Sequence, residues 1–227
     1  MNEPSGIWQS FHGLLRVAAA AVACVMLALL GGCSSKQTED TNRSVVENGA
    51  LREELLRRAK EDQAIRAEEI KRGADKPDKS IRARMGAMSA DNEARLEAII
   101  KQYGWPAPAL VEEDGANAAF VLVQHSGHAF QKKVLPQAKK AYESGQMPGP
   151  HYALLLDRVL VGDRKPQVYG TQARGAEQWK EHEPALYPIE DEANVDKRRA
   201  EMGLEPLSNY VSGLKRTYFP DSQSRTN

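Results

Sequence analysis

The sequence has few cysteines and few aromatic residues, and it has no net charge. Its 227 residues include two cysteines, 6% aromatic side chains, and 31 basic against 31 acidic residues. A nucleic-acid-binding protein needs an excess of basic residues, so neutrality argues against that class and against electrostatic adhesion to anionic lipid. With 27% charged residues, the composition favours a helix-rich soluble globule over a β-sandwich.

Familiar catalytic and metal-binding motifs are also missing. The chain contains no G-x-S-x-G, no H-E-x-x-H and no G-x-x-x-x-G-K sequence. His125 and His128 lie three residues apart, but Gly127 falls between them and no nearby carboxylate completes a set of metal ligands. We therefore predict no metal site and no cofactor, and the sequence leaves open whether the protein is an enzyme.

One apolar run stands out, from Val17 to Leu30. At about fourteen residues it is shorter than the roughly 20 residues that a membrane-spanning helix needs, and it fits the apolar region of a signal peptide. The run ends in Leu30-Gly31-Gly32-Cys33, which resembles the bacterial lipobox. We predict that residues 1–32 are a cleaved lipoprotein signal and that Cys33 is lipidated. An uncleaved single-span anchor is the alternative.

A lipidated Cys33 predicts where the protein resides. Acyl chains at about 0.8 kcal/mol per buried CH₂ make a durable membrane anchor. Ser34 follows the cysteine, and by resemblance to the sorting rules of enteric bacteria this favours the periplasmic side of the outer membrane of a Gram-negative bacterium. Cys24 ends a poorer lipobox, which would leave Val25–Leu30 on the mature chain. With Cys24 removed and Cys33 lipidated, the mature domain has no disulfide.

The mature chain divides into a tether, one domain and a tail. Residues 33–48 are polar and predict a flexible tether, residues 49–217 a single globular domain, and residues 218–227 a disordered tail. The fold class predicted is mainly α (α+β), a helical domain of about six or seven helices with one small β-hairpin. We expect helices at about 50–72, 90–103, 113–125, 128–144, 150–161, 194–202 and 206–217, and a hairpin that pairs 165–172 with 176–180.

Asp62 and Arg66 occupy positions where the helix periodicity predicts core residues. At about 100° per residue, both fall within the arc of Leu51, Leu55 and Ala59. A buried charge must be paired or bound, because an uncompensated one is costly. The two residues therefore form either a structural salt bridge or the floor of a polar pocket.

Other polar residues interrupt apolar segments in the same way. His125, preceded by Gln124, ends an apolar helix, where it is either a hydrogen-bonded core residue or a general base. Asp157 and Arg158 lie inside an apolar run and face different directions, so each needs its own partner. Gln167, Tyr169 and Thr171 share one face of the predicted strand and Gln172 lies on the other, so this strand is either a hydrogen-bonding wall or merely solvated. Asp196, Arg198 and Arg199 lie at the start of the sixth predicted helix. There Asp196 favours the helix dipole, and an arginine can clamp a carboxylate or phosphate.

These residues belong to short motifs that follow one another in a specific order. The motifs are Asp62-Gln63 with Arg66, Gly104-Trp105-Pro106, Gln124-His125-Ser126, Asp157-Arg158-Val159, Gln167-x-Tyr169-Gly170-Thr171-Gln172, Val195-Asp196-x-Arg198-Arg199 and Gly203-Leu204-x-Pro206-Leu207. In this order they resemble a bacterial domain family of unknown function, over about residues 50–212. The charged stretch 73–88 departs from that pattern. The resemblance implies no particular activity, but it does imply that the polar residues belong together.

Two functions of different class remain. The first is a binding or scaffold lipoprotein, with a helical cup lined by these polar residues that holds a small polar ligand or an envelope protein. The second is a hydrolase or lyase, with His125 as general base, Asp157 or Asp62 as its orienting carboxylate, and Arg158 or Arg199 as anion stabiliser. The absence of a recognised nucleophile favours binding. A purely structural domain is a third option.

Overall fold

The computed structural model describes residues 35–72, 78–175, 178–180 and 183–218. The predicted signal at 1–32, Cys33 and nearly all of the predicted tail lie outside these residues. The described chain contains seven α-helices and a short 3₁₀ helix, η3 (Glu192–Asn194). The α-helices are α1 (Ser35–Arg72), α2 (Lys79–Tyr103), α3 (Pro108–Gln124), α4 (His128–Glu143), α5 (Gly149–Gly162), α6 (Val195–Glu201) and α7 (Leu207–Tyr218).

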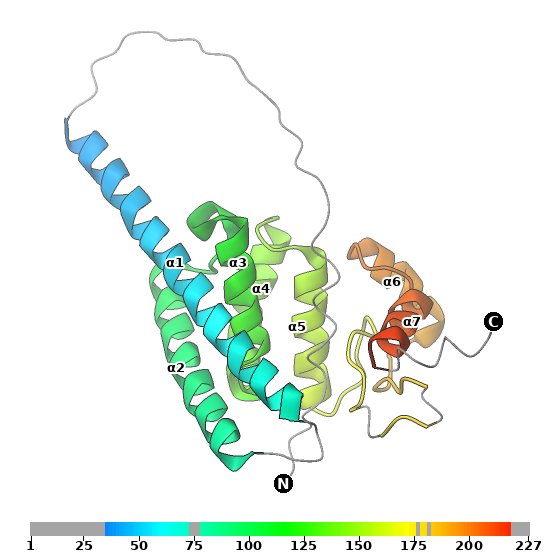
Figure 1. Ribbon diagram of the computed structural model, residues 1–227. Coiled ribbons are helices and arrows are strands. Elements are labelled where there is room, and N and C mark those ends of the chain that lie inside the picture. Colours follow the sequence, from blue (N-terminus) through cyan, green and yellow to red (C-terminus); the bar gives the residue numbers. More distant parts are fainter. Residues whose placement is uncertain (1–34, 73–77, 176–177, 181–182, 219–227) are drawn as a thin grey trace.

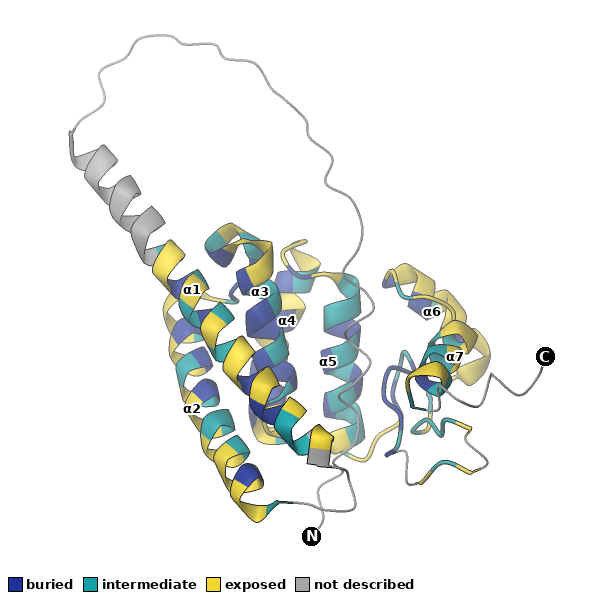
Figure 2. Cartoon of the chain, viewed as in Figure 1, coloured by how far each residue is buried: buried dark blue, intermediate teal, exposed yellow. Residues whose placement is uncertain are grey.

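Helices α1 to α5 pack around one apolar core. Helix α1 packs against α3 and α2, and α4 packs against α5. Figure 1 shows α6, α7 and the coil that precedes them on the far side of α5. Buried and exposed residues alternate along α1 and α2 (Figure 2), as expected for helices with one face on the core. The most deeply buried apolar side chains include Leu55, Leu96, Ile99, Leu122, Val123 and Leu155.

Two helices begin earlier than the sequence predicted. Helix α1 starts at Ser35, inside the segment 33–48 that the sequence predicts as a tether. Once the strongly helix-forming segment after Leu51 has nucleated, each added residue contributes a hydrogen bond at little cost. Helix α2 starts at Lys79, capped by the Asp78 carboxylate, which accepts from the backbone N–H of Ser80 at 2.8 Å. Ser89, which directly precedes the predicted helix start at 90, lies inside the helix.

Helices α3 and α4 each contain an irregular residue. Val111 and Glu112 have non-helical backbone angles, with Glu112 at φ 57°, so the regular part of α3 begins at about the predicted position 113. Pro136 lies inside α4, which continues through it as one helix. Pro136 is exposed, where the carbonyl group that it leaves without a helical partner can be hydrated.

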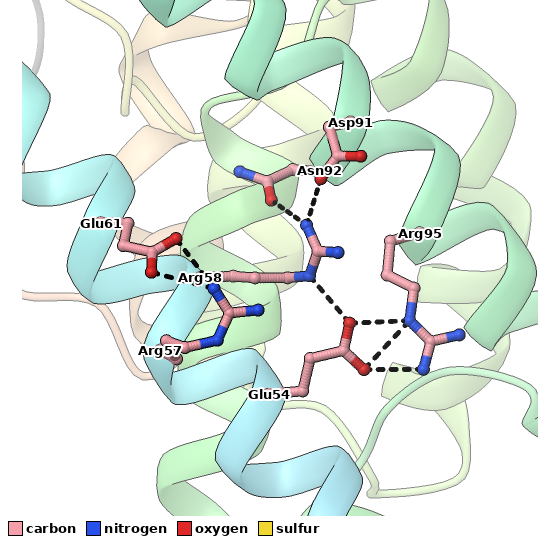
Figure 3. Close-up of polar contacts among 7 residues, drawn as sticks. All are labelled: Glu54, Arg57, Arg58, Glu61, Asp91, Asn92 and Arg95. Carbon is pink, nitrogen blue, oxygen red and sulfur yellow. Dashed lines mark hydrogen bonds and ion pairs between the residues drawn. The ribbon is translucent and has the colours of Figure 1, made fainter.

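A network of charged and polar side chains links α1 to α2 (Figure 3). The Glu54 carboxylate accepts from Nε of Arg58 at 2.9 Å and from Nη2 of Arg95 at 2.7 Å. Arg58 in turn donates to Asp91 at 2.6 Å and to the buried Asn92 at 3.0 Å. Hydrogen bonds from Arg95, and secondarily from Arg58, lower the pKa of Glu54 to about 2.

The predicted β-hairpin is absent. Within the described residues there is no sheet, only isolated bridges, among them Gln167 with Ile189 and Ala173 with Leu186. The segment that begins at Gln167 therefore pairs with 186–189 rather than with 176–180, and the chain bends at residues 168 and 169. The physical reason is that a carboxylate from α5, Asp157, takes the backbone N–H groups of Val168, Tyr169 and Thr171, which a strand ladder would otherwise use.

Candidate functional site

Asp62 and Arg66 form a buried ion pair on α1. Asp62 is only 2% exposed. Nε of Arg66 donates to Oδ2 of Asp62 and Nη2 to Oδ1, both at 3.0 Å. The prediction that these two charged residues lie on the buried face of the first helix is confirmed, and the pairing is the bidentate geometry in which an arginine binds a carboxylate most strongly.

His125 joins this pair from the end of α3. Its side chain is 5% exposed, and its Nδ1 contacts Oδ2 of Asp62. The His125 carbonyl accepts from Ser89 Oγ of α2 at 3.0 Å and from Arg66 at 3.4 Å. Burial lowers the pKa of His125 despite the neighbouring carboxylate, so the imidazole is neutral near pH 7 and donates from Nδ1. His125 therefore joins α1, α2 and the end of α3.

Asp62 remains charged in this environment. Burial alone would raise the pKa of its carboxyl group, but hydrogen bonds from His125 and Arg66 outweigh that effect and lower it. At neutral pH the pair therefore consists of a carboxylate and a guanidinium.

Arg158 brings a second guanidinium from α5. Burial lowers the pKa of Arg158 to about 10, and the charge of Arg66 contributes to the same shift. The charges of Arg66 and Arg158 also lower the pKa of His125.

Gln124 is an unusual buried residue beside His125. It is 2% exposed, and within the described residues neither its side-chain oxygen nor its nitrogen has a hydrogen-bond partner. One turn earlier on α3, the Phe120 ring stacks on the His151 ring of α5 at 3.9 Å between centroids. Gln124 lies four residues after Phe120, about one helical turn, so it is on the same side of α3. Arg158 lies seven residues after His151, about two turns, so it is on the same side of α5. Asp62, Arg66, Gln124, His125 and Arg158 are called the polar cluster below.

Asp157 is not part of the polar cluster. It has no exposed surface, and its carboxylate accepts from the N–H groups of Val168 at 2.7 Å and Thr171 at 3.0 Å and from the Thr171 hydroxyl at 2.9 Å. Burial raises its pKa even against these hydrogen bonds. Of the two carboxylates suggested as partners of His125, the structure brings only Asp62 to the ring.

The polar residues of 167–172 are largely occupied by the segment itself. Gln167 donates to the carbonyl groups of Gln172 at 2.9 Å and Tyr187 at 2.8 Å and accepts from the Gln172 N–H at 2.8 Å. Thr171 bonds to Asp157, and Tyr169 is only half-buried. These side chains hold the segment in place, and none of the hydrogen bonds described for them involves His125.

The candidates on α6 also bind the protein backbone. Arg199 is 1% exposed and donates to the carbonyl groups of Tyr169 and Glu205, both at 2.7 Å. Arg198 donates to the carbonyl groups of Val168, Glu190 and Asp191. The Asp196 carboxylate accepts from the N–H of Leu207 at 2.7 Å, at the start of α7 rather than of its own helix.

Tyr210 was not singled out from the sequence. Its hydroxyl donates to the Thr171 carbonyl at 2.8 Å, and burial raises its pKa to about 12. The only sequence signal was its position on the inward face of the last helix. It connects α7 to the segment that Asp157 organises, and its electrostatic effect reaches Arg158.

Two further properties bear on function. Among the described residues, no three His, Cys, Asp or Glu side chains gather so that they can hold a metal ion. No helix in the described part of the chain combines the length and the apolar character needed to cross a membrane.

Comparison with known proteins gives one match. No curated protein and no solved structure matches the chain. The model of a family of unknown function (DUF6624) matches residues 49–221. This span covers α2 to α7 and all of the polar cluster, and because it is well over half of the sequence, the chain belongs to this family.

Proposed function

We propose that the protein is a lipid-anchored cell-envelope protein that binds a small anionic ligand at the polar cluster. The observation that carries this proposal is the buried amide of Gln124, which has no hydrogen-bond partner in the described chain. It lies next to His125, on which the charges of two guanidinium groups, Arg66 and Arg158, both act. A buried polar group without a partner calls for an explanation, and a ligand that it binds is one.

The chemistry of the cluster favours a carboxylate or phosphate. Arg66 and Arg158 offer planar arrays of N–H donors, which suit the oxygens of a carboxylate or phosphate. In a site with little water a guanidinium group attracts an anion more strongly than it would at the surface. The Gln124 amide adds a donor for an anion oxygen.

The binding proposal is tested by titrating the purified mature chain with acetate and inorganic phosphate while observing the His125 ring by NMR. We expect saturable shifts and a higher pKa of His125 in the presence of the anion, because a nearby negative charge favours the imidazolium form. Arg158→Gln should weaken the affinity about tenfold or more, as loss of a charged hydrogen bond does.

Arg57→Gln is the matched control. Arg57 is exposed and pairs only with Glu61 in the contacts described, so this variant should bind as the wild type does. Equal affinities for the wild type and Arg158→Gln, or no saturable shift with either anion, would refute the proposal and leave the cluster with a structural role.

The envelope location is supported by Leu30-Gly31-Gly32-Cys33 at the end of the only long uncharged apolar run. Mass spectrometry of the protein extracted from membranes should find a chain that begins at Cys33 and carries acyl groups. Cys33→Ser should remain unprocessed. An intact N-terminus or an unmodified cysteine in the native protein would contradict this part of the proposal.

A second candidate function is acid–base catalysis by His125, as in a hydrolase or lyase. The observation that favours it is that Asp62 contacts Nδ1 of a neutral imidazole, the arrangement in which a carboxylate orients a general base. The test is hydrolysis of a panel of esters and phosphoesters by the wild type and by His125→Gln. A rate that falls at least about a hundredfold in the variant, with unchanged anion binding, would favour catalysis.

A further inference from the structure

A second site lies at the other end of the contact between α3 and α5. There the Trp105 elbow, the first turns of α3, the loop between α4 and α5 and the start of α5 enclose a cavity of about 160 Å³. No residue of the polar cluster lines it. The side chains that define its chemistry are Trp105, Glu113, Asn117, Phe120, Gln146 and His151.

The cavity has aromatic walls. The Phe120 and His151 rings are nearly parallel, at 8° with 3.9 Å between centroids, and Trp105 contributes a further ring. Burial lowers the pKa of His151 to about 4, so at neutral pH this wall carries no positive charge. In the described part of the chain, neither ring nitrogen of His151 takes part in a hydrogen bond, which leaves them for a bound molecule.

Glu113 gives the cavity its charge. It is one of three consecutive acidic residues, and the two on either side, Glu112 and Asp114, both pair with Arg52, at 3.4 and 2.5 Å. Glu113 lines the cavity instead and has no ion pair among the described residues. No lysine or arginine lines this cavity, so its only full charge at neutral pH is negative.

We propose that this cavity binds the ammonium group of a small organic amine. A cation over aromatic faces is attracted by the ring quadrupole, most strongly by tryptophan, and a nearby carboxylate adds to that attraction. The amide groups of Asn117 and Gln146 are further polar contacts. The volume is smaller than the roughly 300–1,000 Å³ of pockets for drug-sized ligands, so the occupant is about the size of one long side chain. The site goes beyond the anion binding proposed above and does not depend on it.

The experiment is an NMR titration of the mature chain with n-butylammonium, following the Trp105 indole N–H. Butyrate and n-butanol, which have the same apolar body, serve as anionic and neutral comparisons. We expect saturation by n-butylammonium at concentrations up to roughly 50 mM, as a millimolar site requires, and little effect of the other two. A lysine with blocked α-amino and α-carboxyl groups is titrated as well. If it binds more tightly than n-butylammonium, the amine belongs to a peptide, and if it binds more weakly, the amine is a free small molecule.

Two neighbouring variants make the test specific. Glu113→Gln should weaken n-butylammonium binding about three- to fivefold, the effect of one partly exposed charge pair. Glu112→Gln removes the same charge one residue away, outside the cavity, and should bind as the wild type does. The proposal is overturned if n-butylammonium causes no saturable shift, if butyrate binds equally well, or if the two variants have the same affinity.

Discussion

Replacing Asp62 is expected to lower the free energy of unfolding more than most other single substitutions in the protein. Asp62→Asn leaves the Arg66 guanidinium buried without its carboxylate. We expect a loss of about 3–5 kcal/mol in the free energy of unfolding, measured by urea denaturation. Glu61→Gln removes the carboxylate of the exposed Arg57–Glu61 pair on the same helix and should cost at most about 0.5 kcal/mol. Similar losses in both variants would show that the buried pair has no special role.

His151 should make the protein sensitive to mild acid. Its pKa is about 4 in the folded protein, against 6.5 for the free side chain. As the pH falls from 6.5 to about 4, the unfolded chain takes up a proton that the folded chain does not, so stability falls with pH in this window.

His151→Phe keeps a ring against Phe120 and removes this titration. Relative to the wild type, the variant should gain about 1–3 kcal/mol between pH 7.5 and pH 4. Denaturation curves at several pH values provide the measurement. A difference between the two proteins that does not change with pH would contradict this account.

At the residue scale, local patterns were more informative than long-range ones. The burial of Asp62 and Arg66 followed from helix periodicity alone, because both lie within the apolar stripe of one helix. The contact of Asp62 with His125 joins residues 63 positions apart, and no periodicity encodes such a pairing. Glu113 and His151 escaped notice, since Glu113 lies in an acidic run and His151 follows a proline at a helix start, both ordinary surface patterns.

At the scale of elements, a single side chain determines the path of the segment after α5. Asp157→Asn keeps the size of the side chain but removes one acceptor oxygen and the charge. We expect the amide hydrogens of residues 168–171 to exchange faster with deuterium and the free energy of unfolding to fall by about 1–3 kcal/mol.

Asp163→Asn is the control for Asp157→Asn. Asp163 comes directly after α5, and it pairs with Lys132 and His128 rather than with residues 168–171. Exchange at residues 168–171 should be unchanged in this variant. If Asp157→Asn leaves their exchange unchanged as well, another contact holds the segment.

The sequence predicted the helices but not the path of residues 165–172, and Asp157 explains the second of these results. Helices are closed by local hydrogen bonds, so periodicity and terminal residues located all seven. The starts of α1 and α2 were missed; in α2, Ile81, Met85 and Met88 have helical spacing, but charged residues lie among them. The segment 165–172 has the composition of a strand. Its backbone donors are nevertheless taken by Asp157 from a preceding helix, and strand patterns assume that a partner strand takes them.

At the scale of the whole molecule, the Glu54 network contributes to the attachment of α2 to the rest of the bundle. The pKa of Glu54 is about 2 when folded and 4.5 in the free side chain. A lowered carboxyl pKa contributes stability that is fully present above pH 4.5 and is lost as the pH falls toward 2. Glu54→Gln should therefore be less stable than the wild type at pH 6, and the gap should narrow between pH 4.5 and 2.5. Parallel stability curves for the two proteins would argue against this role.

The claim that the polar cluster is a ligand site is tested most directly by Gln124→Leu. A buried amide without partners costs about 1–3 kcal/mol, so replacing it with a leucine of similar size should raise the melting temperature of the ligand-free protein. If the amide is kept for binding, the same variant should lose affinity for acetate or phosphate. The account predicts both results in one preparation, higher stability and weaker binding. A variant that is less stable and binds the anion as tightly as the wild type would contradict it.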